Sequence, residues 1–210
     1  ASDQESADWC AYMLSEGHSF FIYSSDSVDS LSSCCRLRNE LQENTFSYTL
    51  GAGGIATGSK CVMTININRL VQNTYRLGLN LREEVYKQAK KIHKYLTAFN
   101  AIETRMFKQH MLQVYDAGFI SLDHQFLTIG INGAIEGAEF LGIDINDNEQ
   151  YRQYIEDILE PIYRADKEDR TETLKWNCEF VPAENLGVKN AKWDRKDGYY
   201  VPRDCYNSYF

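Results

Sequence analysis

The 210-residue sequence contains no apolar run that approaches the length needed to cross a bilayer, and we expect no signal peptide. Basic residues are also in deficit, since 22 lysines and arginines stand against 30 aspartates and glutamates, a net charge of -8. This balance argues against a general nucleic-acid surface, so a polyanion would bind only in a local pocket. The composition, 43% apolar and 25% charged, is that of a soluble globular protein. We expect a cytoplasmic protein that contacts neither membrane nor nucleic acid directly.

The cysteines lack the spacing of a disulfide framework, and no Cys-x-x-Cys motif occurs. A chain of this length does not depend on disulfides for its core, so a reducing interior fits better. We expect no metal site in this segment. Two histidines in a predicted helix, His93 and His110, have no partner at ligand spacing, so we interpret them as surface or hydrogen-bonded residues. The six cysteines are Cys10, Cys34, Cys35, Cys61, Cys178 and Cys205.

One stretch, residues 31–39, places two adjacent thiols, Cys34 and Cys35, beside Arg36 in a polar, serine-rich segment. Four interpretations are open. The cysteines could be small buried hydrophobes, or they could form a vicinal disulfide, which needs a strained peptide geometry. A metal site would need further ligands at suitable spacing, which this stretch lacks. The fourth interpretation is a reactive thiol on a loop that projects into a cavity.

Hydrophobic patterns predict strands alternating with helices along the chain. That alternation predicts an α/β fold with a mainly parallel sheet. Residues 24–33 are rich in serine and aspartate and predict a loop that leads to the cysteines. The predicted helices cover residues 8–14, 80–115, 132–141, 148–163 and 184–191; the predicted strands cover 19–23, 61–70, 119–129 and 172–181, with extended segments at 199–201 and 206–210.

The predicted strand at 61–70 carries Asn66 on its polar face and follows a glycine-rich stretch at 51–58. The glycine-rich stretch lacks the Lys-Ser/Thr ending of a P-loop and does not match the dinucleotide fingerprint. A flexible turn or lid therefore competes with a phosphate-binding loop. The carboxamide of Asn66 must find a hydrogen-bond partner if it is buried, either a ligand or a neighbouring strand.

A second candidate site is the turn Gly130-Ile131-Asn132-Gly133, which joins a predicted strand to a predicted helix. Free N–H groups at such a junction point toward the carboxyl end of the strand, a place suited to anions. A tight turn with Asn132 as a helix cap explains the same residues equally well.

Several motifs also occur in one order along the chain. They are Ser33-Cys34-Cys35-Arg36-Leu37-Arg38, Gly51-Ala52-Gly53-Gly54, residues 58–70, 130–133, 179–185, Ala191-Lys192-Trp193-Asp194 and residues 206–210. In this order they resemble the middle of the anaerobic (class III) ribonucleoside-triphosphate reductase, a glycyl-radical enzyme. The resemblance covers almost the whole chain. It implies that residues 1–210 are the central portion of a catalytic barrel domain, an excerpt of a longer or split enzyme.

The resemblance implies an α/β fold that is part of a ten-stranded barrel, with the thiol stretch threading its centre as a finger loop. It also implies that Cys35, or as second choice Cys34, forms the thiyl radical that abstracts the ribose 3′-hydrogen. The family's glycyl radical, zinc cluster and N-terminal nucleotide-binding domain would lie outside this segment, so we expect the chain alone to be inactive. The implied substrate-binding residues are Arg36, Asn132, Gly133, Glu184 and Asn185.

The resemblance further implies a ribonucleoside triphosphate substrate, allosteric control by ATP, a radical SAM activating enzyme, a remaining barrel segment or partner chain, and a homodimer of the complete enzyme. In members that take electrons from formate, an asparagine matching Asn66 lies beside the thiyl cysteine. Formate is therefore the expected reductant, and Asn66 the third catalytic residue. Two alternatives stay open: an acyltransferase like pyruvate formate-lyase, which shares the barrel, and a non-catalytic fragment that complements a partner chain.

Overall fold

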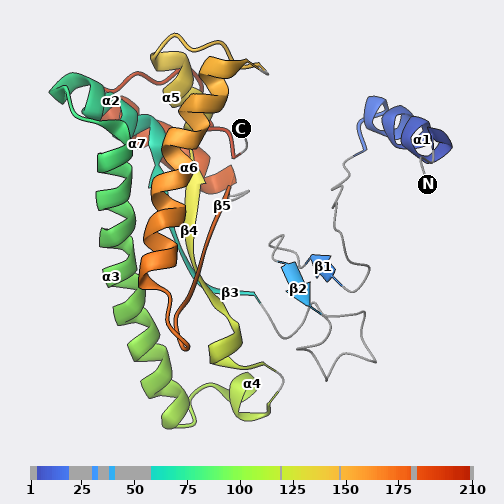
Figure 1. The fold of residues 1–210 in the computed structure, drawn as a ribbon, viewed down its shortest axis with the longest axis vertical. Coiled ribbons are helices and arrows are strands. Elements are labelled where there is room, and N and C mark those ends of the chain that lie inside the picture. The colour runs from blue at the N-terminus through green and yellow to red at the C-terminus, as the bar shows by residue number, and fades with distance from the viewer. Residues whose placement is uncertain are drawn as a thin grey trace. The chain divides into compact units, whose positions relative to one another are not determined.

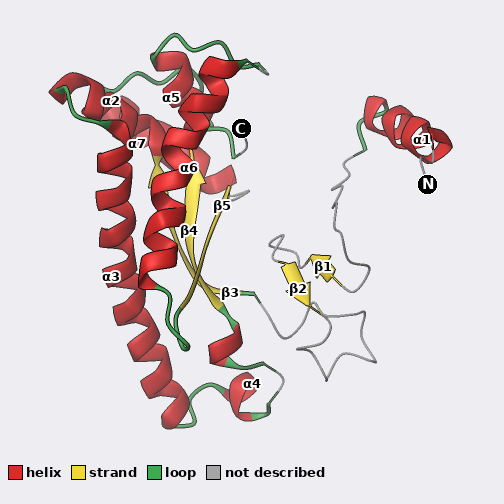
Figure 2. Cartoon of the chain, in the orientation of Figure 1, coloured by secondary structure: helices red, strands yellow, loops and turns green. Residues whose placement is uncertain are grey.

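A computed structural model of the chain describes residues 4–18, 30–32, 38–40, 58–118, 120–146, 148–180 and 184–208. The chain divides into two compact units, Ala1–Gly54 and Ile55–Phe210. The second unit contains a three-stranded sheet (Figures 1 and 2). No helix among the described residues is long and apolar enough to span a membrane.

The first unit contains a helix, α1 (Gln4–Ser15), and two short antiparallel strands, β1 (Ser30–Ser32) and β2 (Arg38–Glu40). The prediction of a helix here is confirmed, and Gly17 follows its end with a positive φ of 87°. The prediction of a loop through residue 33 is wrong at its end, because residues 30–32 pair with the strand that follows. The predicted strand at 19–23 and the residues Cys34, Cys35 and Arg36 lie outside the described residues.

The second unit is built on a three-stranded parallel sheet with the order β3-β4-β5. The strands are β3 (Ser59–Asn66), β4 (Phe126–Asn132) and β5 (Lys175–Phe180). In register, the last residue of β3 pairs with the last residue of β4, so both strands end at one edge of the sheet. The predicted parallel α/β sheet is confirmed. The described residues do not show the ten-stranded barrel.

The two faces of the sheet differ in chemistry because successive side chains of a strand point to opposite faces. One face is apolar and packs against two long helices, α3 (Leu81–Lys108) and α6 (Glu149–Asp169), which lie along the sheet in Figure 1. Ile65, Ile129 and Ile131 join this core. The opposite face carries Val62 and Phe126 near the starts of the strands and polar or small residues beyond them, namely Thr64, Asn66, Thr128, Gly130, Asn132 and Asn177.

A helix that the sequence patterns did not predict, α2 (Ile67–Leu77), follows β3 without a loop. The predicted strand at 61–70 is therefore wrong beyond residue 66. Asn66 is the N-cap of α2, and its side-chain oxygen accepts a hydrogen bond from the backbone N–H of Arg69 at 3.1 Å. Asn66 and Asn68 alternate with isoleucines and imitate a strand, whereas the buried positions 67, 70, 71 and 74 have helical spacing.

The other predicted elements exist with shifted ends. Asn80 caps α3 as predicted, accepting from the N–H of Glu83, but the predicted helix to residue 115 ends at Lys108 and a separate short helix, α4 (Gln113–Asp116), follows. A 3₁₀ turn, η2 (Leu122–His124), replaces the start of the predicted strand at 119–129. The helix predicted after Gly133 is α5 (Ala134–Phe140).

Near the C-terminal side, α6 is capped by Asn148 and continues past the predicted end at residue 163, with Pro161 inside it. The strand β5 is shorter than the predicted 172–181. The last helix, α7 (Glu184–Lys196), begins where predicted and runs beyond residue 191. Residues 199–208 form neither a helix nor a strand. Extended segments were predicted at 199–201 and 206–210, of which residues 209–210 lie outside the described residues.

His93 is buried between α3 and α6. Its Nδ1 lies 2.7 Å from Asp169 and its Nε2 2.8 Å from Asp166, both on α6. The ring also stacks on Trp176 of β5 with 3.9 Å between ring centroids. The interpretation of His93 as a hydrogen-bonded residue is confirmed. Its partners lie far along the sequence, where helical spacing could not indicate them.

Candidate functional site

The candidate site lies at the edge of the sheet where β3 and β4 end. Asn66 and Asn132 are the final residues of these strands and pair in register. In open parallel α/β sheets, ligands bind outside the carboxyl ends of the strands. The structure therefore brings Asn66, Asn132 and Gly133, predicted from separate motifs, to one edge.

Helix α7 crosses this edge and bonds to both strand ends. Asn190 Nδ2 donates to Asn132 Oδ1 at 2.9 Å. Asn66 Nδ2 donates to the two carboxylate oxygens of Asp194 at 2.9 and 3.1 Å. Asn190 and Asp194 are four residues apart on one face of the helix, so α7 fixes the side-chain amides of both strands at once.

The carboxylate of Asp194 collects donors from three elements. It is fully buried and accepts from Arg69 Nε at 2.6 Å and from the Tyr206 hydroxyl at 2.8 Å, in addition to Asn66. Asn68 Nδ2 approaches it more distantly, at 3.4 Å. Burial, with the hydrogen bond to Asp194, raises the pKa of Tyr206 well above its ordinary value, so this hydroxyl remains a donor.

The segment 199–208 is bonded to the same cluster through α2. Asn68 Nδ2 donates to the Tyr200 carbonyl at 2.9 Å and to the Tyr206 hydroxyl at 2.7 Å. Gln72 Nε2 also donates to the Tyr200 carbonyl, at 3.0 Å, and its Oε1 accepts from the Tyr200 N–H. Two buried amides of α2 therefore hold a chain segment that has no regular structure of its own.

Gly133 occupies the turn between β4 and α5 with a positive φ of 79°. A β-carbon at this position would lie 3.1 Å from Tyr206 Cδ2 and 3.4 Å from Asn68 Cβ, so both backbone conformation and space favour glycine. Its N–H donates to the carbonyl of Asn207 at 3.2 Å, and Asn132 Nδ2 donates to the same carbonyl at 3.1 Å. Here the polar groups of the turn bond to the protein chain.

Glu136, in the first turn of α5, is a second fully buried carboxylate. Its Oε1 accepts from Arg203 at 2.6 Å and from the N–H of Asn207 at 2.9 Å. Its Oε2 has no hydrogen-bond partner within the described part of the chain. Arg203 and Asn207 thereby attach the segment 199–208 to α5 as well as to α2.

The other predicted site residues lie in α7 or outside the described residues. Glu184 begins α7, and Asn185, next to it, is exposed. Cys34, Cys35 and Arg36 belong to residues 33–37, which connect β1 to β2 and are outside the described residues. Among the described residues, no group of three or more histidine, cysteine, aspartate or glutamate side chains could hold a metal ion.

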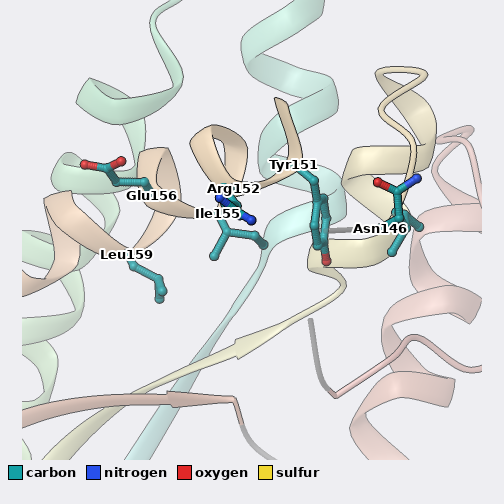
Figure 3. A pocket seen from close by; sticks show the side chains of 7 residues that line it. Asn146, Tyr151, Arg152, Ile155, Glu156 and Leu159 are labelled. Atoms are coloured by element: carbon teal, nitrogen blue, oxygen red, sulfur yellow. The ribbon is translucent and has the colours of Figure 1, made fainter. Parts of the chain in front are cut away.

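The described residues of the second unit line at least two pockets. One, of about 420 Å³, lies between β3, α2 and α3 and is lined by Asn66 together with Thr64, Arg69, Asn73, Lys91 and Tyr95 among others. The other, of about 610 Å³, has mostly apolar walls of α6 and the preceding loop, including Tyr151, Ile155 and Leu159 (Figure 3). Because no predicted site residue lines the second pocket, the edge near Asn66 is the candidate site.

Sequence reasoning missed Asp194 as a site residue, together with Asn68, Asn190, Tyr206 and Glu136. One signal was available in α7, whose buried positions 187, 190, 191 and 194 follow a helical stripe. Two of these positions are polar, and buried polar side chains need partners. A polar residue on a helix's buried stripe was therefore the signal for Asn190 and Asp194.

Comparisons with known proteins agree with this architecture. The family model described as anaerobic ribonucleoside-triphosphate reductase matches residues 4–210. No curated protein matches the sequence significantly. Among solved structures, the anaerobic ribonucleotide reductase from Thermotoga maritima in complex with dATP and CTP is 27% identical, with a TM-score of 0.69 over 89% of this chain and 31% of its own.

The same Thermotoga maritima enzyme with citrate in the active site is 27% identical, with a TM-score of 0.64 over 72% of this chain and 30% of its own. A further structure, described as anaerobic ribonucleotide reductase, is 26% identical, with a TM-score of 0.66 over 75% of this chain and 27% of its own. The chain thus spans less than a third of the length of these solved relatives. Because the family model covers nearly all of its residues, the chain belongs to the anaerobic ribonucleoside-triphosphate reductase family.

Proposed function

We propose that this chain carries part of the catalytic centre of an enzyme that reduces ribonucleoside triphosphates to 2′-deoxyribonucleoside triphosphates. The observation that carries the proposal is the family match, which runs through both the Cys34-Cys35 stretch and the edge at Asn66. The pairing of β1 with β2 also supports it, because Ser32 pairs with Arg38 and the two thiols belong to the short connection between them.

In the proposed reaction, Cys35 is the residue that exchanges hydrogen with the ribose. A glycyl radical outside this chain supplies the oxidising equivalent by accepting the hydrogen atom of the thiol. The Cys35 sulfur radical then takes the ribose 3′-hydrogen, and the 2′-hydroxyl takes up a proton and leaves as water. Formate gives up its hydrogen and two electrons as it becomes carbon dioxide, C2′ gains that hydrogen, and the sulfur returns the original hydrogen to C3′. A cysteine S–H bond is weak enough for this exchange to be nearly balanced, and an enclosed site shields it from solvent.

Asn66 is proposed to contact the ribose hydroxyls or formate. Its carboxamide offers two N–H donors and two acceptor lone pairs, and the described contacts leave capacity for a ligand. Arg36, Asn132, Gly133, Glu184 and Asn185 are proposed to hold the rest of the substrate. For Asn132 and Gly133, the contacts to Asn207 would have to be shared with the substrate or exchanged for it.

Formate is proposed as the source of the two electrons, leaving as carbon dioxide. The positions of two cysteines in the sheet support formate over a dithiol. Cys61 packs beside Leu96 and Trp176 on the apolar face, opposite to Asn66, and Cys178 pairs in register with Ile129 on that face. Burial raises the pKa of both thiols, which keeps them protonated and weakly nucleophilic.

The complete enzyme is proposed to be a cytoplasmic homodimer with a radical SAM activating enzyme, a zinc cluster outside this segment, and allosteric control by ATP. The Thermotoga maritima relative in complex with dATP and CTP supports a nucleotide substrate and a nucleotide effector. The family match favours the reductase over an acyltransferase. The complementing-fragment alternative predicts co-elution of this chain with a second barrel segment.

The test is turnover of CTP to dCTP with formate by the complete, anaerobically activated enzyme. Cys35→Ser should bind nucleotide and fold normally but give no product, because a serine O–H bond is too strong to exchange hydrogen with ribose. Cys34→Ser should be milder, and Cys205→Ser, at an exposed position, serves as a control. An inactive Cys34→Ser with an active Cys35→Ser would exchange the two assignments, and activity in both would overturn the thiyl proposal.

A further inference from the structure

We propose that Asp194 is a positioning residue that holds the carboxamide of Asn66 in the orientation in which it meets the substrate. The inference rests on the proposed function, because it takes Asn66 as a substrate contact. Asp194 is itself fully buried, so it would act through Asn66 and not by touching the substrate.

The orientation of the Asn66 carboxamide is set at both of its ends. Its Oδ1 accepts from the backbone N–H of Arg69 at 3.1 Å, and its Nδ2 lies 2.9 and 3.1 Å from the two oxygens of Asp194. One N–H can be shared between two such oxygens. The second N–H of Asn66 Nδ2 and the second lone pair of Asn66 Oδ1 then point in a direction that Asp194 and Arg69 together determine.

Asp194 has the chemistry that this arrangement needs. Asn66, Arg69 and Tyr206 each donate to it, and Asn68 approaches as a fourth donor. A carboxylate is acceptor-only and serves all of them, whereas an asparagine would offer one oxygen and turn its own N–H groups toward donors. The guanidinium of Arg69, 2.6 Å away, balances the buried charge.

A purely structural role for Asp194 predicts a different result from a positioning role. If Asp194 only links α7 to α2, it stabilises the fold whether or not residue 66 is asparagine. A positioning residue affects turnover only while the carboxamide of Asn66 is present. A double-mutant cycle between the two positions separates these roles, because coupling appears as non-additivity.

The experiment measures kcat and KM for CTP, with formate as reductant, in the complete activated enzyme. The variants are Asp194→Asn, Asn66→Ser and the double variant; serine at position 66 retains a good cap for α2. Asp194→Asn should lower kcat by about 10- to 100-fold with a smaller change in KM, as misplacement of a reacting contact does. The double variant should have the kcat of Asn66→Ser alone.

Losses in kcat that multiply in the double variant would overturn the positioning role of Asp194 while leaving Asn66 in the site. A wild-type kcat for Asn66→Ser would overturn both the substrate role of Asn66 and the inference built on it. The matched control is Asp197→Asn, which removes the other carboxylate partner of Arg69, at 2.7 Å, from a half-exposed side chain. Its kcat should stay unchanged, and an equal loss would assign the effect to Arg69 and overturn the proposal.

Asp194→Glu keeps the proposal testable if Asp194→Asn does not fold. The glutamate retains the charge opposite Arg69 but moves the carboxylate by one methylene, so it should lower kcat without unfolding the protein. In the Asn66→Ser background, Asp194→Glu should cause no further loss of kcat. A further loss of similar size in the Asn66→Ser background would overturn the positioning role of Asp194.

Discussion

A β-carbon on Gly187 of α7 would lie 2.7 Å from the carbonyl oxygen of Tyr206 and 3.0 Å from the sulfur of Cys205. Helix α7 and segment 199–208 therefore pack with their backbones in contact, at the place where α7 crosses the edge of the sheet. This contact places the Tyr206 hydroxyl within reach of Asp194, on the next turns of the same helix.

Gly187→Ala should destabilise the complete protein by about 1 to 3 kcal/mol, because the added methyl group meets backbone atoms that cannot move aside cheaply. The same change at an exposed helical position would normally be stabilising. Thermal unfolding measures the effect, and limited proteolysis should show easier cleavage within 199–208. Val188→Ala, at an exposed neighbour, is the control and should shift stability by about 0.5 kcal/mol or less. An equally stable Gly187→Ala protein would contradict the close contact.

Asn66→Ala should lower both turnover and melting temperature. The structure adds the second effect, because Asn66 caps α2 and bonds to Asp194. Loss of an N-cap costs about 0.5 to 2 kcal/mol. Asn66→Ser keeps a capping hydroxyl and should lower kcat at saturating substrate with a smaller change in melting temperature. Normal turnover in both variants with a lowered melting temperature would make the role of Asn66 structural.

The choice of reductant gives a separate prediction. The complete enzyme should form dCTP with formate and not with a thioredoxin system, because Cys61 and Cys178 lie on the face of the sheet opposite to Asn66. Cys61→Ser and Cys178→Ser should therefore retain turnover wherever the protein folds. Turnover with a thioredoxin system and none with formate would contradict the formate proposal.

Asp169→Asn should destabilise the packing of α3 on α6 at neutral pH. Burial opposes ionisation of Asp169, but hydrogen bonds from Lys90 and His93 hold its pKa below the ordinary 3.8. A lowered pKa contributes stability above the unfolded value, and this contribution is lost as the pH falls through the folded value. We expect a loss of about 1 to 2 kcal/mol at pH 7, since the side chain is partly exposed.

The pH dependence distinguishes this effect from general damage. The stability difference between wild type and Asp169→Asn should be present at pH 7 and shrink below pH 3.8. Asp166→Asn is the matched comparison: burial raises the pKa of Asp166, so its ionisation opposes folding at neutral pH. A difference for Asp169→Asn that persists unchanged at pH 2.5 would contradict the electrostatic account.

The chain expressed alone should be oligomeric or aggregation-prone, and inactive. Within the described residues β3 and β5 each pair on one side only, and Val62 and Met63 of β3 are exposed. Unpaired strand edges and exposed apolar side chains favour association. Size-exclusion chromatography with light scattering measures the state, and a monodisperse, cooperatively folding monomer would contradict this prediction.

Local sequence patterns determined much of the fold. Alternating strands and helices predicted the parallel sheet, and Asn80 and Asn148 marked the starts of α3 and α6 because a cap bonds to an N–H only three residues away. Asn66 and Asn132 were predicted as site residues from the motifs at 58–70 and 130–133. The ordered family motifs identified the reductase, and the family match confirmed it.

Tertiary structure alone decided which polar groups meet. Asn66 and Asn68 both alternate with isoleucines, so the sequence predicts a strand through both, although β3 ends at Asn66 and Asn68 lies in α2. The cap bond between Asn66 and Arg69 is local, and only the contact with Asp194, far along the chain, shows that the other end of the carboxamide is held too. His93 likewise has its carboxylate partners on α6, at a separation that no helical spacing can indicate. Short-range hydrogen bonds and periodicity depend only on neighbouring residues, so the sequence predicts them. The partner of a buried polar group depends instead on how distant elements pack.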